Sequence, residues 1–222
     1  FFASYYPEAD HSALTAAGKW AIADMSFKPF AACRHTHPVI SAVLALPEAA
    51  ISSGVNRIDV YTYQAALDFC NNQVPMTAEE ARFSIQHAAA TTFLKGKPTI
   101  SDFEPPALTE PKIMSLRTQV HLHKDAVLDA AFPNSFGARV CVITQDMQRH
   151  EVTCPAAWGD PENPMSEADL INKFVTNAAH GGLTAKATDG LLHAVLNLHD
   201  AHDLSALQRA LVTPLSTKLE FL

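Results

Sequence analysis

The sequence has few charged residues, no closely spaced cysteines and no long apolar run. Charged residues make up 18% of the 222 positions, and the formal net charge of −7 argues against a nucleic-acid surface, which needs clustered Lys and Arg. The four cysteines form no CxxC pair, a pattern typical of reduced thiols in a cytoplasmic protein rather than of a disulfide framework. No apolar stretch approaches the roughly 20 residues that cross a bilayer, so we expect no membrane span.

Common catalytic motifs are missing as well. The chain has no serine or cysteine nucleophile motif and no glycine-rich phosphate loop. Two histidine pairs, His35 with His37 and His121 with His123, have spacings that allow both rings to face one metal ion. No third ligand at convincing spacing accompanies either pair, so we expect no metal centre.

Apolar residues, by contrast, are plentiful. At 48% hydrophobic content over 222 residues, the chain can bury the core of one domain, or of one domain with an appendage. It begins at Phe1 rather than at a methionine. We therefore expect the C-terminal part of a longer protein, or a processed product.

A cationic segment precedes an apolar run near the start of the chain. Residues 27–37 read FKPFAACRHTH and contain Lys28, Arg34 and two histidines, and Pro38 then opens a run with helical spacing. Such a loop leading into a helix N-terminus can bind a carboxylate or a phosphate. A solvated basic loop is the alternative. Cys33 beside Arg34 could have a lowered pKa, but nothing else indicates thiol catalysis.

The periodicity predicts both helices and strands. We expect helices near residues 13–17, over residues 38–51, from about 79 to 94, and over 166–180, 184–198 and 204–211. We expect strands over residues 57–63, 116–123, 138–144 and 149–154. The last two join near Asp146 and Met147, without the glycine that a two-residue hairpin prefers. The mixture predicts an α+β domain followed by helices that pack elsewhere.

Two side chains have surroundings that suit catalysis. Lys28 lies beside Phe27 and directly before Pro29, which favours an extended backbone, and a partly dry pocket there would strengthen its charge. An ordinary surface lysine is the alternative. His87 lies on a mostly apolar face of its expected helix, where a titratable ring can transfer protons. The alternative for His87 is a hydrogen-bonded core histidine.

Three strings of residues resemble the MmgE/PrpD family. They are KPFAACRHTHPVISA from Lys28, EARFSIQHAAATTFLKG from Glu80 and GDPENPMSEADLINKF from Gly159, in matching order and spacing. The resemblance runs from about residue 15 to 210. Members of the family include 2-methylcitrate dehydratase, cis-aconitate decarboxylase and iminodisuccinate epimerase.

The resemblance implies a domain arrangement. Family members combine a large all-helical domain with a smaller α+β lid, and the resemblance covers only their C-terminal half. Residues 1–25 would then be an entry segment from the helical domain, and residues 26–165 the lid with about four strands flanked by helices. Residues 166–222 would be helices that return to the helical domain. The rest of that domain would be an N-terminal part or a partner chain.

The resemblance also implies a site between lid and helical domain. Its catalytic residues would be Lys28 and His87, and Arg34, His35 and His37 would contact substrate carboxylates. The family chemistry removes a proton or CO2 next to a carboxylate, which leaves a carbanion that a cation stabilises. His87 would hold the substrate or move the proton. The resemblance implies neither a metal nor an organic cofactor.

Three functions therefore remain open at this point. The first is a lyase that dehydrates or decarboxylates a small di- or tricarboxylic acid. The second is an epimerase of an amino- or imino-dicarboxylate, which returns the proton to the opposite face. The third is a non-catalytic lid fragment or subunit that binds an acidic metabolite. By analogy with the family we expect a cytoplasmic homodimer.

Overall fold

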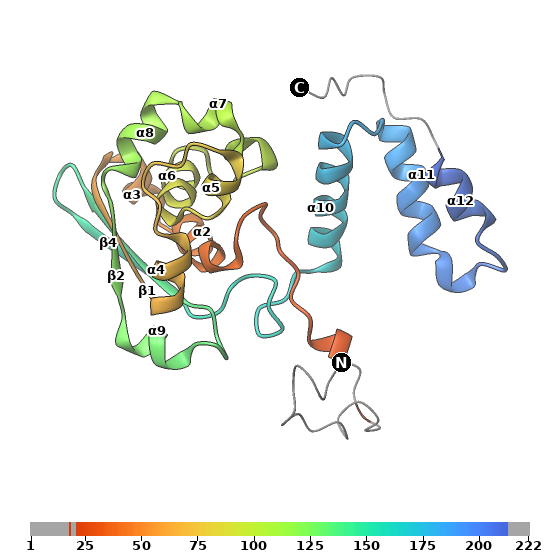
Figure 1. Cartoon of the computed structure of the whole chain (residues 1–222), viewed down its shortest axis with the longest axis horizontal. Coiled ribbons are helices and arrows are strands. Elements are labelled where there is room, and N and C mark those ends of the chain that lie inside the picture. The colour runs from red at the N-terminus through yellow and green to blue at the C-terminus, as the bar shows by residue number, and fades with distance from the viewer. Residues whose placement is uncertain (1–17, 19–20, 213–222) are drawn as a thin grey trace, which may run out of the picture.

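The structure is a computed structural model that describes residue 18 and residues 21–212. Within them, a four-stranded sheet with helices packed on it forms an α+β unit, and a group of helices, α10 to α12, lies beside that unit (Figure 1). The predicted fold class is confirmed. The helix expected near residues 13–17 lies outside the described residues.

The sheet combines parallel and antiparallel pairing. Its strands are β1 (Val55–Thr62), β2 (Val120–Lys124), β3 (Ala138–Thr144) and β4 (Arg149–Cys154), in the order β2-β1-β3-β4. β1 pairs parallel to β2 and antiparallel to β3, and β3 pairs antiparallel to β4. The predicted bounds of β3 and β4 are confirmed. Met147, at φ 62°, adopts the left-handed conformation in the turn between them, which explains how the hairpin closes without glycine.

One face of the sheet builds the core because alternate strand residues point to the same side. Ile58 and Val60 of β1 are fully buried, and Ile58 lies opposite Val120 of β2 and Val142 of β3. The helices α2 (His37–Leu44) and α6 (Ile85–Lys95) pack on this side. The strand expected over residues 57–63 is therefore confirmed as β1, which runs over Val55–Thr62.

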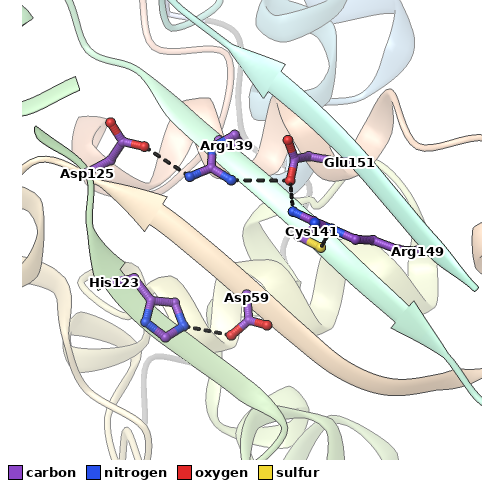
Figure 2. Close-up of polar contacts among 7 residues, drawn as sticks. All are labelled: Asp59, His123, Asp125, Arg139, Cys141, Arg149 and Glu151. Carbon is purple, nitrogen blue, oxygen red and sulfur yellow. Dashed lines mark hydrogen bonds and ion pairs between the residues drawn. The ribbon is translucent and has the colours of Figure 1, made fainter. Parts of the chain in front are cut away.

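The opposite face of the sheet is polar (Figure 2). Nε2 of His123 lies 2.6 Å from a carboxylate oxygen of Asp59, and Arg139 reaches Asp125 at 3.0 Å and Glu151 at 3.2 Å. The two ion pairs of Arg139, whose side chains are partly exposed, typically contribute about 1 kcal/mol or less each. They make this face compatible with water.

The remaining elements are short helices and turns. Their bounds are η2 (Ala21–Asp24), η3 (Arg34–Thr36), α3 (Glu48–Ser52), α4 (Gln64–Cys70), α5 (Ala78–Arg82), η4 (Ile100–Phe103), α7 (Pro105–Leu108), α8 (Pro111–Arg117), α9 (Ala126–Ala131), α10 (Glu167–His180), α11 (Ala185–Leu196), η5 (Leu198–Asp200) and α12 (Ser205–Leu211). None of the helices in the described ranges has both the length and the apolar character needed to cross a bilayer.

Three predicted elements differ from the structure. The helix expected over 38–51 is split at Pro47, which lacks an N–H and caps α3 instead. The helix expected from 79 to 94 is split at Ser84, whose hydroxyl accepts the backbone N–H of His87 at 2.9 Å and starts α6. In the strand expected over 116–123, Leu116 and Arg117 instead end α8, which begins with Pro111 in its first turn.

Candidate active site

A cavity of about 410 Å³ opens between the α+β unit and α10. Residues 28–31 form one part of its wall, residues 97–100 a second, and Met165 with four side chains of α10 a third. A capping box at Ser166 and Asp169 fixes the start of α10, in agreement with the helix expected over residues 166–180. The cavity thus joins three segments that are distant in the sequence.

The charge of this wall is positive. Lys28, Lys97 and Lys173 line the cavity, and none of the described lining residues is an aspartate or a glutamate. Asp169 lies close enough for the charge of Lys97 to contribute to the lowered pKa of that carboxyl, whose main cause is its hydrogen bond with Ser166. In a chain of net charge −7, such a cavity favours an anionic ligand.

Lys28 faces this cavity from an exposed position, and not from the dry pocket that its sequence suggests. It forms no hydrogen bond or ion pair with any residue from 21 to 212. Its segment is anchored one residue earlier, because the N–H of Phe27 donates to the carbonyl of Gly159 at 2.9 Å. A Cβ at Gly159, where φ is 94°, would lie 1.9 Å from the Phe27 carbonyl oxygen. Glycine at this position therefore allows the close approach that places Lys28.

Arg34 is engaged by the protein itself. Its guanidinium lies 2.7 Å from a carboxylate oxygen of buried Asp160 and stacks 3.8 Å above the ring of Phe136. The contact with Asp160 joins the cationic segment to the loop that follows β4. Arg34 does not line the cavity.

His35 lies in an aromatic cluster. Its Nδ1 is 2.7 Å from the hydroxyl of Tyr63, and the rings of Phe69 and Phe136 stack on it at 5.7 and 5.6 Å. Burial lowers the pKa of His35, with Arg34 the next contribution. The neutral imidazole is therefore the form that this cluster favours.

His37 is buried at the start of α2, with 1% of its surface exposed. Its Nε2 lies 3.2 Å from the carbonyl oxygen of Ala32, and its ring meets that of Phe30 edge-on at 5.2 Å. Burial lowers the pKa of His37 to about 4. Phe30 itself lines the cavity, so His37 supports the wall from behind.

His87 is fully buried within α6. Its Nε2 donates to the carbonyl oxygen of Asp102 at 2.7 Å, and its Nδ1 has no hydrogen-bond partner in the described part of the chain. Burial lowers the pKa of this histidine. The bond to Asp102 holds η4, whose Ile100 lines the cavity.

The structure thus separates the residues that the sequence brings together. Of Lys28, His87, Arg34, His35 and His37, only Lys28 belongs to the cavity wall described here. The catalytic and substrate roles of all five residues stay predictions. The hydrogen bond of His87 favours the core-histidine alternative, whereas Arg34, His35 and His37 are held by protein partners and do not form a solvated loop. Within the same described ranges, no group of three or more His, Cys, Asp or Glu side chains is placed to hold a metal ion.

Sequence reasoning missed two lysines of the cavity. Lys97 follows Gly96, the C-cap of α6, and Lys173 lies within the third string of the resemblance. Nothing in the sequence connects positions 97 and 173, because only the packing of α10 against the α+β unit brings them to one cavity. The one available signal was the position of Lys173 in that string.

Comparison with known proteins gives a family and two curated relatives. Residues 30–199 match the MmgE/PrpD C-terminal domain. The chain is 27% identical to cis-aconitate decarboxylase of Mus musculus over 222 residues and 26% identical to cis-aconitate decarboxylase of Homo sapiens over 221 residues. Each match covers 96% of this chain and 45% of the relative, so the chain spans a little under half the length of these relatives. Because the domain match covers most of its residues, the chain belongs to the MmgE/PrpD family.

Proposed function

We propose that this chain supplies the Lys28 side of the active site of a lyase that removes CO2 from a small tricarboxylic acid. The observation that carries the proposal is the position of Lys28, which lines a cavity with two further lysines and no acidic residue among the described wall. The family and the printed name of the two relatives, cis-aconitate decarboxylase, direct the proposal to decarboxylation. Cis-aconitate is therefore the first substrate to test.

Decarboxylation creates the charge that Lys28 would stabilise. When the carbon–carbon bond to the departing carboxylate breaks, CO2 leaves and the electron pair stays on the remaining carbon. Delocalisation onto a neighbouring carboxylate spreads this charge over oxygen atoms, and a proton then adds to carbon. An ammonium held near those oxygens lowers the energy of the transition state, because the charge develops there during the step.

The buried residues would act by positioning. Asp160 holds Arg34 at 2.7 Å and so fixes the loop that begins α2, while His37 and Phe30 support the wall beside Lys28. We propose the same kind of role for His87, which anchors η4 through Asp102. The proton-transferring groups would then belong to parts of the active site outside residues 21–212.

The two regions of the chain would then have different roles. We propose that residues 26–165 form a lid over the active site and that residues 166–222 belong with a helical domain. That domain would be another part of the gene product or a partner chain, and a homodimer is the assembly we propose. The cavity between residues 28–31 and α10 lies where two such domains would meet.

The complete gene product tests this proposal with three acids. Incubation with cis-aconitate, 2-methylcitrate and iminodisuccinate, followed by proton NMR and by detection of CO2, distinguishes decarboxylation, dehydration and epimerisation. We expect CO2 from cis-aconitate, and CO2 release should fall at least tenfold in Lys28→Ala. Turnover of 2-methylcitrate or iminodisuccinate in place of cis-aconitate would contradict decarboxylation, and turnover of none would contradict the proposal as a whole.

A further inference from the structure

The substrate class proposed above needs more than one cation. A tricarboxylic acid carries up to three negative charges, and Lys28 supplies one positive charge. Each carboxylate that leaves water needs a cation or hydrogen-bond donors as replacements. The cavity wall holds further groups of this kind.

Lys173 is the first of them. It lies within α10 and is half-buried, and its ammonium forms no hydrogen bond or ion pair with any other described residue. Asn172, Thr176 and Asn177 of the same helix also line the cavity and offer amide and hydroxyl donors. This side of α10 can therefore meet an anion with a charge and several donors.

Lys97 is the second. Its ammonium lies 4.8 Å from the centre of the Trp158 ring, which holds the side chain beside the cavity. Asp169 offsets part of its charge. Lys97 belongs to the α+β unit, whereas Lys173 belongs to α10, so one ligand that meets both would connect the two parts.

We propose that Lys97 and Lys173 bind a second carboxylate of the substrate and thereby couple α10 to the α+β unit. This inference rests on the proposed function for the identity of the ligand class. Its alternative is a pair of surface lysines whose stems only cover the apolar wall. If the lysines form a second carboxylate site, affinity depends on how many carboxylates the ligand carries. If they are only surface lysines, it does not.

Binding of an unreactive tricarboxylate tests the pair. Isothermal titration of the complete gene product with tricarballylate, glutarate and propionate compares three, two and one carboxylates. We expect Lys97→Gln and Lys173→Gln each to weaken tricarballylate at least tenfold and propionate less than threefold. The control variants Lys112→Gln and Lys186→Gln, at exposed positions outside the cavity wall, should bind like wild type. Tricarballylate affinity within twofold of wild type in Lys173→Gln would overturn the inference.

Hydrogen exchange gives a second readout of the same binding. Tricarballylate should slow amide exchange in α10 in wild type and not in Lys173→Gln, and equal protection in both would count against coupling. If tricarballylate behaves as expected while no acid is turned over, the proposed reaction fails and the carboxylate site stands. If turnover occurs and Lys173→Gln changes neither KM nor kcat, the site fails and the reaction stands.

Discussion

The two halves of the cationic segment differ in what surrounds their charges. Residues 28–31 border an open cavity, and Lys28 has no ion-pair partner among residues 21–212. Residues 34–37 are tied to the protein through Asp160, Tyr63 and the Ala32 carbonyl. The charge of Arg34 is thus paired with Asp160, whereas the charge of Lys28 remains available to a ligand in the cavity. Four substitutions test this difference between the two halves of the segment.

Gly159→Ala tests the half that borders the cavity and should have the largest effect. Its Cβ would meet the Phe27 carbonyl oxygen at 1.9 Å, and φ at this position is 94°. We expect a loss of about 3 kcal/mol of unfolding free energy or more, together with displacement of Lys28. Urea denaturation monitored by circular dichroism measures this loss of unfolding free energy. Unchanged stability would show that the Phe27–Gly159 contact does not constrain this segment.

The buried half should respond to pH through His37. Its pKa of about 4 in the folded protein lies below the unfolded value, so the neutral ring stabilises the fold. That contribution is complete above about pH 6.5 and is lost as pH falls toward about 4, a change of about 3 kcal/mol.

His37→Gln cannot titrate and is the matched variant for this effect. The stability difference between wild type and His37→Gln should therefore shrink by about 3 kcal/mol between pH 7 and pH 4. A difference that stays constant with pH would place His37 in contact with solvent or ligand.

Arg34→Ala distinguishes a structural arginine from a substrate-binding one. Its loss leaves the buried Asp160 carboxylate without its partner, for an expected cost of about 2 kcal/mol after allowing for the partial exposure of Arg34. Asp160→Asn in the same chain should restore part of this stability. A raised KM with unchanged melting temperature would instead support the substrate role that the family resemblance implies.

Tyr63→Phe should have the smallest effect. It removes the hydroxyl that lies 2.7 Å from Nδ1 of His35 and keeps the ring that stacks on Phe132 at 4.6 Å. We expect a loss of about 1 kcal/mol with kcat unchanged. A large fall in kcat would mean that His35 takes part in the reaction.

The comparison also separates what the sequence could predict from what it could not. The strands expected over residues 138–144 and 149–154 match β3 and β4, and the helix expected over 166–180 matches α10, because the signals for these elements are local. The breaks at Pro47 and Ser84 were missed because a strong apolar period continues across both.

Of the site, Lys28 was predicted from its flanking residues and from the family strings. The partners of Arg34 and His35 were not, because Asp160, Phe136 and Tyr63 are distant in the sequence. The sequence alone does not distinguish a basic residue whose acidic or aromatic partner is distant in the chain from a basic residue that has no partner. Lys97 and Lys173 were missed for the same reason, since only the folded chain brings them to one cavity.

The most direct measurement is the kcat of Lys28→Met with cis-aconitate in the complete gene product. Methionine keeps most of the side-chain volume and removes the charge. We expect kcat to fall about 100-fold or more, because a single charge-stabilising contact is typically worth that much. Melting temperature should stay unchanged, and Lys186→Met should behave like wild type. A kcat within twofold of wild type would contradict the role of Lys28 in stabilising the carbanion.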